Sequence, residues 1–127
     1  MPLSQVFWTF AFTAFDLPVF RSLFRWTWSC MNEHLPVHYL RQTETLLAFN
    51  HPRPVYPVHI LLVPKRPLSN IKELNSTDSQ FLVDVFACVQ SLVEEFGLDE
   101  KGYRLIINGG PYQDVPQLHF HLISEAS

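Results

Sequence analysis

The strictest alternation of polar and apolar positions in this chain lies near its C-terminus. Residues 117–123 read Gln-Leu-His-Phe-His-Leu-Ile, in which polar and apolar side chains take turns. A period of two residues is typical of a β-strand that packs one face on a core. We therefore expect Gln117, His119 and His121 to share the other face, with neighbours roughly 7 Å apart. At that spacing two imidazole rings can converge on one phosphate group or one metal ion.

Three other apolar runs favour strands. Residues 58–63 are continuously apolar between prolines, except for His59, and this pattern is typical of a central strand covered on both faces. A lone histidine in such a run is usually a satisfied core residue. Residues 46–49 are a shorter apolar run, residues 103–107 (Tyr-Arg-Leu-Ile-Ile) are a mainly apolar one, and residues 50–54 between two of the strands form a proline-rich turn.

Helical spacing appears in one long stretch of the second half. Residues 77–80, Thr-Asp-Ser-Gln, have the pattern of a capping box that begins a helix. Apolar residues then recur at i, i+3 and i+4 up to Phe96, and Gly97 ends the pattern. Residues 69–74 favour a single helical turn. With a further helix expected near the N-terminus, the order of elements predicts an α+β fold with a mainly antiparallel sheet and two main helices.

The N-terminal third has a different character and predicts a separate extension, residues 1–36, before a domain spanning 37–127. Residues 6–15 are strongly apolar, but they are too few to span a bilayer and lack the features of a signal peptide. Asp16 and Pro18 indicate a helix start, followed by aromatic residues at helical spacing. We interpret this helix as packing on the domain or on a partner subunit; the alternative is a peripheral membrane contact.

Composition narrows the classes of protein. A 127-residue chain with 47% hydrophobic and 17% charged residues indicates one globular domain. Its net charge of −3 and pI near 6.0 argue against a broad basic surface, so no nucleic-acid partner is expected. Cys30 and Cys88 are too few for a disulfide scaffold or a cysteine-rich zinc site. A reducing cytosol, and hence a cytoplasmic location, is the default.

The C-terminal pattern resembles the signature of the histidine triad (HIT) superfamily, His-φ-His-φ-His-φ-φ, where φ is apolar. Residues 46–49, 57–65 (Pro-Val-His-Ile-Leu-Leu-Val-Pro-Lys) and 102–108 resemble the other landmarks of this family in the same order. The resemblance runs from the mid-forties to the C-terminus. The one departure within the motif is Gln117, which stands in place of the first histidine.

The resemblance implies a HIT-like α+β domain that pairs into a continuous sheet across a homodimer. It implies a hydrolase or nucleotidyl transferase that acts on a nucleotide or nucleotide conjugate without a cofactor or metal. His119 would attack the α-phosphorus and form a covalent intermediate that water cleaves, as in nucleophilic catalysis generally. His121 and His59 would hold phosphate oxygens or fix the tautomer, and Gln117 would complete the catalytic group. Substrate-binding positions would be Asn108, Gly110, Gln113, Asp114 and Val115, partly through backbone N–H groups.

Several alternatives remain open at this stage. The amide of Gln117 can donate a hydrogen bond but cannot change charge near neutral pH, so acid–base work at that position is lost. The chain is then either an enzyme with altered turnover or a non-catalytic nucleotide-binding protein. A site with zinc bound to His59, His119 and His121 is a second hypothesis. A third is a membrane-associated interaction module with a vestigial pocket. His51 occupies the place where nucleotide-binding relatives commonly have a ribose-binding carboxylate, which leaves the nucleoside and leaving group open.

Overall fold

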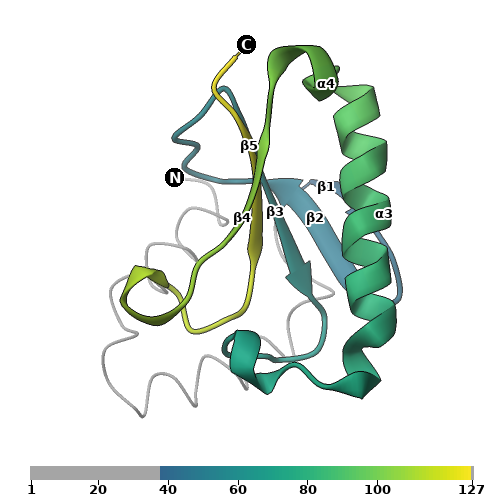
Figure 1. Ribbon diagram of the computed structural model, residues 1–127, viewed down its shortest axis with the longest axis vertical. Coiled ribbons are helices and arrows are strands. Elements are labelled where there is room, and N and C mark those ends of the chain that lie inside the picture. Colours follow the sequence, from purple (N-terminus) through teal and green to yellow (C-terminus); the bar gives the residue numbers. More distant parts are fainter. Residues whose placement is uncertain (1–37, 127) are drawn as a thin grey trace.

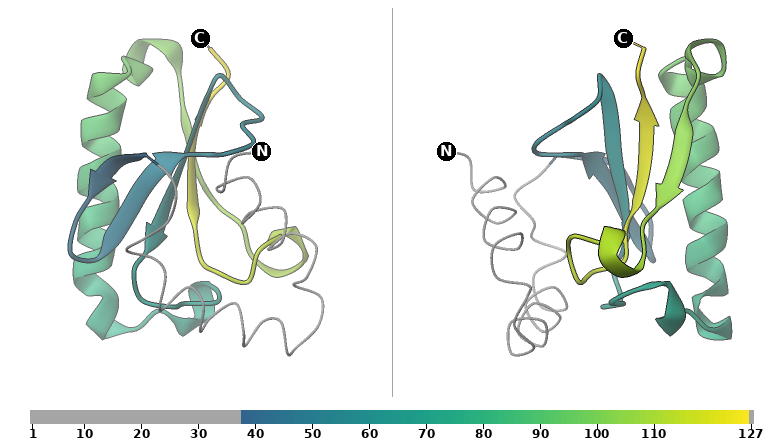
Figure 2. Two further views of the ribbon diagram at one scale, coloured as in Figure 1. Left: turned by 180° about the vertical axis from the view of Figure 1, so that it is seen from behind. Right: turned by 60° about the vertical axis from the view of Figure 1, so that its left-hand side comes forward.

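Residues 38–126 of the chain are described by the computed structural model (Figure 1). Five strands form one antiparallel sheet in the order β1-β2-β3-β5-β4. The strands are β1 (Tyr39–Gln42), β2 (Leu46–Asn50), β3 (Val58–Pro64), β4 (Arg104–Ile107) and β5 (Phe120–Ser124). Helix α3 (Ser79–Glu95) lies along one face of the sheet, and the short α4 (Leu98–Lys101) leads into β4 (Figure 2). The predicted α+β fold is confirmed.

The sheet faces follow from the alternation of side chains. Leu62 of β3 and Phe120 and Leu122 of β5 belong to the core cluster that packs against α3. His59 and Leu61 point to the opposite face, because neighbouring residues of a strand alternate. Leu61 is also buried, so β3 is covered on both faces as its continuous apolar sequence predicted. His121 pairs with Leu61 across the ladder and shares that second face.

Helix α3 begins and ends close to the residues that its sequence pattern predicted, with one correction at its start. The capping box spans Asn75 to Asp78 and so begins two residues before the predicted 77–80: Thr77 N–H donates to Asn75 Oδ1, and Asn75 N–H donates to Asp78 Oδ2. A 3₁₀ turn, η3 (Ser76–Asp78), therefore precedes the helix. At the other end Gly97 has φ 63°, a left-handed conformation that glycine adopts without strain.

Two further expectations need correction. Sequence patterns missed β1, which forms a hairpin with β2 and contains polar residues. The last strand begins at Phe120, not at residue 117, because the chain before it pairs elsewhere. Leu118 N–H donates to the carbonyl of Leu68 over 2.6 Å, and Pro116 has no N–H to offer a ladder. The lead-in to β5 is thus held by the segment after β3.

Other expectations about the chain have mixed outcomes. Cys88 lies in the hydrophobic core, as predicted, and burial raises the pKa of its thiol. The turn expected in residues 69–74 is the 3₁₀ helix η2 (Ile71–Glu73). Within residues 38–126, no helix has the length and hydrophobicity needed to cross a membrane. The predicted N-terminal helix, its membrane contact and Cys30 lie outside the described residues.

Candidate functional site

Four histidine rings gather on the face of the sheet away from α3. His59 comes from β3, His121 from β5, His119 from the lead-in to β5, and His51 from the residue after β2. The ring centroids of His51 and His59 are 4.4 Å apart, those of His59 and His121 are 5.2 Å apart, and those of His119 and His121 are 4.8 Å apart. The structure therefore brings together the three histidines that the motif and its resemblance predicted, together with one more. These four residues are called the histidine cluster below.

His51 was missed as a member of this cluster. The sequence placed it in a proline-rich turn, whereas β2 and β3 pair with Asn50 opposite Ile60, so that His51 falls opposite His59. The backbone confirms this, because His51 N–H donates to the carbonyl of His59 over 2.8 Å. The sequence contains part of this signal, because two antiparallel strands joined by a turn bring together the residues that flank the turn, but it does not give the register of the two strands.

Hydrogen bonds fix which ring nitrogens carry protons in His59 and His121. Val55 N–H donates to His59 Nδ1 over 3.2 Å, so neutral His59 has its proton on Nε2. That Nε2 lies 2.9 Å from His121 Nδ1, which must then accept. Neutral His121 consequently carries its own proton on Nε2. The backbone amide of Val55 thus determines, through His59, which ring nitrogen of His121 acts as a hydrogen-bond donor.

His119 has the opposite arrangement. Its Nδ1 lies 2.7 Å from the backbone carbonyl oxygen of Gln117. A carbonyl can only accept, so Nδ1 of His119 carries the proton and Nε2 of the neutral ring keeps its lone pair. This is the tautomer that a histidine nucleophile or general base requires, with its orientation fixed by the second nitrogen.

All four histidines have lowered pKa values, chiefly because burial disfavours the charged ring. The pKa of His121 falls to about 3, and the neighbouring His119, His59 and His51 add to the effect of burial. The pKa of His51 falls to about 4 for the same two reasons. Burial outweighs the hydrogen bond to Gln117, which favours the charged form of His119. The cluster is therefore neutral at physiological pH, which keeps the lone pair of His119 available.

Gln117, whose backbone oxygen contacts His119, is 2% exposed. Both its side-chain atoms, Nε2 and Oε1, are buried without a hydrogen-bond partner, and so is Nε2 of His121. No other buried side-chain nitrogen or oxygen in residues 38–126 is in this position. An unsatisfied buried polar group costs about 1–3 kcal/mol, so three such atoms on Gln117 and His121, the residues two positions either side of His119, indicate a site that is completed by a polar ligand.

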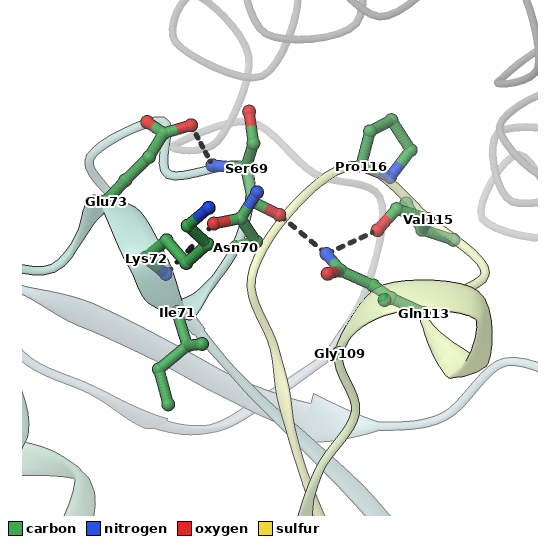
Figure 3. A pocket seen from close by; sticks show the side chains of 10 residues that line it. Ser69, Asn70, Ile71, Lys72, Glu73, Gly109, Gln113, Val115 and Pro116 are labelled. Carbon is green, nitrogen blue, oxygen red and sulfur yellow. Dashed lines mark hydrogen bonds between the residues drawn. The ribbon is translucent and has the colours of Figure 1, made fainter.

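The loop between β4 and β5 carries the predicted substrate-binding residues. Asn108 follows β4 directly, and Gly110 begins the 3₁₀ turn η4 (Gly110–Tyr112) with φ 57°. The side-chain Nε2 of Gln113 donates to the carbonyls of Ser69 and Val115, over 2.5 and 3.0 Å (Figure 3). The backbone N–H of Gln113 donates to Gly110. The donor groups of Gln113 thus hold the loop together.

A cavity of about 560 Å³ lies between this loop and the segment after β3 (Figure 3). Its lining includes three predicted substrate-binding residues, Gly110, Gln113 and Val115, together with Ser69, Asn70 and Lys72. Within the described chain, Asn108, Asp114 and the histidine cluster are not part of that lining. The segment from Gln113 to His121 therefore borders the cavity at one end and supplies catalytic candidates at the other.

The hypothesis of a three-histidine zinc site conflicts with this geometry. Both ring nitrogens of His59 and Nδ1 of His121 are engaged in hydrogen bonds. Among residues 38–126, no group of three or more histidine, cysteine or acidic side chains is arranged to hold a metal ion. His59 has no lone pair left for a metal while the hydrogen-bond chain is intact.

Comparisons with known proteins agree with the fold. The HIT domain family model matches residues 32–127. An uncharacterized HIT-like protein of Synechococcus elongatus is 34% identical over 99 residues, which cover 76% of this chain and 86% of the relative. The crystal structure of a HIT family hydrolase from Legionella pneumophila has a TM-score of 0.70 and 29% identity, covering 79% of this chain and 91% of that one. A histidine triad nucleotide-binding protein from Candida albicans has a TM-score of 0.67 and 25% identity, with coverages of 83% and 75%.

The lowered histidine pKa values predict that acid destabilises the fold. Between pH 7 and pH 5 the unfolded chain binds protons on His51 and His121, near a pKa of 6.5, while the folded chain does not, so the free energy of unfolding falls as pH falls. The loss at pH 5 is about 1–2 kcal/mol per neutral histidine, and less for the partly exposed rings, which solvent screens. The lowered pKa values of Asp78 and Asp84 remove stability only at lower pH.

Urea unfolding at pH 7 and pH 5 measures this effect, with His51→Asn as the matched variant. The variant should lose less stability between the two pH values than the wild type, because one titrating group is gone. Equal stability of the wild type at both pH values would contradict the neutral cluster.

Proposed function

The chain belongs to the HIT domain family, and we propose that it hydrolyses a nucleotide conjugate at the α-phosphate by transferring the nucleotidyl group to His119. One observation carries this proposal: the Gln117 carbonyl holds the proton of His119 on Nδ1, which leaves the lone pair on Nε2. The similar HIT family hydrolase and histidine triad nucleotide-binding protein support the substrate class. A neutral imidazole with a fixed tautomer is a competent nucleophile toward phosphorus.

The reaction would proceed in two displacements. In the first, His119 Nε2 forms a bond to phosphorus as the bond to the leaving group breaks, and the electron pair of that bond goes to the leaving group. In the second, water attacks the phosphorus, loses a proton and releases the nucleoside monophosphate, and the electron pair returns to His119 Nε2. The ring keeps its Nδ1 proton throughout, so Gln117 O remains a useful acceptor for the transiently cationic adduct.

The other cluster members would stabilise the phosphoryl group. His121 presents a buried Nε2–H without a partner, and this donor can bind a phosphate oxygen whose charge increases in the transition state. His59 fixes that donor through its contact with His121 Nδ1. Asn108, Gly110 and Asp114 remain proposals for substrate positioning, with Val115 and Gln113 contributing through the loop that they hold in place.

The proposal is tested with the p-nitrophenyl ester of adenosine 5′-monophosphate and its guanosine counterpart. Release of nitrophenolate and of nucleoside monophosphate in equal amounts is the expected result. Tight binding of monophosphates by calorimetry without turnover would instead indicate the non-catalytic nucleotide-binding protein. Neither binding nor turnover would overturn the proposed substrate class.

We also propose a homodimer formed through β4 and α3. β4 is an edge strand of the sheet, and Phe86 of α3 and Tyr103, which precedes β4, are large apolar side chains exposed by 57% and 44%. A cavity of about 700 Å³ lies over the same surface, lined by Phe86, Val89, Val93 and Leu105 among others. Pairing of β4 with β4 of a second copy would satisfy the edge and cover these side chains.

Sedimentation velocity tests the dimer. Phe86→Glu places a charge in the proposed interface and should convert a dimer to a 14.8 kDa monomer. Ile71→Glu is the control, because Ile71 is 51% exposed but lies in η2, away from β4 and α3. A wild-type chain that sediments as a monomer would contradict the proposal.

A further inference from the structure

The histidine cluster contains a nucleophile and hydrogen-bond donors, but its described members offer no proton donor suited to a basic leaving group. The titratable groups around His119 are His121, in ring contact with it, and His59, His51 and Asp114, which contribute to the electrostatics of the cluster. The three neighbouring histidines are neutral at physiological pH for the reasons given above, and their remaining protons are bound to weakly acidic neutral rings. The remaining polar side chain is Gln117, whose amide neither gains nor loses a proton.

The demand for a proton depends on the leaving group. When a phosphorus–nitrogen bond breaks, the electron pair stays on nitrogen, and the amine can leave only if that nitrogen takes up a proton. An alkoxide has the same requirement. When a bond to a phosphate, carboxylate or acidic phenol oxygen breaks, the electron pair stays on an oxygen that is stable as an anion, and no proton is needed. A positioned acid therefore matters for the first group and little for the second.

Building on the function proposed above, we infer that Gln117 makes this chain selective for leaving groups that depart as anions. These are phosphates, pyrophosphates, carboxylates and acidic phenolates attached to the α-phosphorus of a nucleotide; amines and alkoxides are disfavoured. Gln117 is the specificity-determining residue in this account.

The buried amide also explains how such an anion is accommodated. Gln117 Nε2 and His121 Nε2 are buried donors without a partner, and both belong to the segment that carries His119. Neutral donors stabilise a departing oxygen anion and the phosphoryl oxygens without having to give up a proton. Gln117 Oε1 is then satisfied by a hydroxyl group of the ligand or by water. The unsatisfied atoms, which are a cost in the empty protein, become contacts when substrate is bound.

Competing substrates that share one nucleoside test this inference. The ratio of kcat/KM for an adenosine 5′-phosphoramidate to kcat/KM for the p-nitrophenyl ester of adenosine monophosphate is measured in wild type and two variants. Gln117→His restores a titratable group and should raise the ratio by about 100-fold, the lower range of a general-acid contribution. Gln117→Met has similar length but neither donor nor titratable group, so kcat/KM for the phosphoramidate should not rise above the wild-type value, and any change in the ratio should come from a slower reaction of the ester.

A series of substituted phenyl esters provides a second measurement. We expect kcat/KM to fall steeply as the phenol becomes less acidic, and to fall less steeply in Gln117→His. An unchanged ratio in Gln117→His, or a wild type that cleaves the phosphoramidate as fast as the nitrophenyl ester, would overturn the inference while leaving the proposed function intact. No turnover of the nitrophenyl ester by wild type would overturn the proposed function and the inference together.

Discussion

His119→Ala should lower kcat for the hydrolysis of a nucleotide ester by about 10⁴-fold or more, because it removes the atom that bonds to phosphorus. The described cluster offers no obvious substitute nucleophile. His59 has both ring nitrogens in hydrogen bonds, and His121 presents a protonated nitrogen without a lone pair. Loss of His119 therefore removes the covalent route altogether, and any residual rate would come from direct attack by water.

The measurement is the release of nitrophenolate and monophosphate at pH 7, with His38→Ala as the control. His38 is exposed and lies before β1, outside the cluster, so its removal should leave kcat unchanged. Far-ultraviolet circular dichroism of both variants verifies folding. A His119→Ala variant that retains more than a tenth of wild-type kcat would show that another group attacks the phosphorus.

His121→Phe should lower kcat by about 10²–10³-fold, the usual cost of removing one preorganised donor from a transition-state oxygen. Phenylalanine keeps a ring of similar size in the strand but has no N–H. His59→Phe should have a smaller effect, about tenfold, because His59 acts only through His121: without it, Nδ1 of His121 loses its donor and the ring can populate the other tautomer. His59 is thus a positioning residue.

Nitrogen-15 NMR of the histidine rings separates these two roles. In the wild type, the proton of His121 should be on Nε2, and in His59→Phe a measurable fraction should move to Nδ1. A merely structural role for His59 would lower stability without this change of tautomer. Equal losses of kcat in the two variants, with no change of tautomer, would contradict the hydrogen-bond chain from Val55 through His59 to His121.

The sequence predicts much of the fold because its signals are local and strong. The run of β3, apolar except for His59, predicts a strand that is buried on both faces. The wide apolar stripe of α3 predicts a helix that is buried on one face. The weaker elements have less distinctive patterns. β1 has the sequence Tyr-Leu-Arg-Gln, which does not alternate strictly, and it is fixed by pairing with β2. The start of β5 depends on a hydrogen bond between Leu118 and Leu68, which no local pattern reveals.

The candidate site likewise contains some features that the sequence reveals and others that it does not. His119 and His121 are visible as a motif, and His59 stands out as the one polar residue of its strand. His51 was missed because its role depends on the register of β2 against β3, which the prolines of the intervening turn obscure. The tautomers of His59 and His119 depend on backbone atoms of Val55 and Gln117, and sequence spacing gives no access to such contacts. Sequence spacing also does not show that the side chain of Gln113 donates hydrogen bonds to the carbonyls of Ser69 and Val115.

The central claim, a covalent bond between His119 and the nucleotidyl group, is tested most directly by intact-protein mass spectrometry after rapid acid-free quenching of the reaction. With a nitrophenyl ester of a nucleoside monophosphate, wild type should gain the mass of one nucleotidyl group, and peptide mapping should place it on His119. The adduct should be absent from His119→Ala. Steady release of monophosphate without any adduct in wild type, or an adduct that persists in His119→Ala, would contradict the claim.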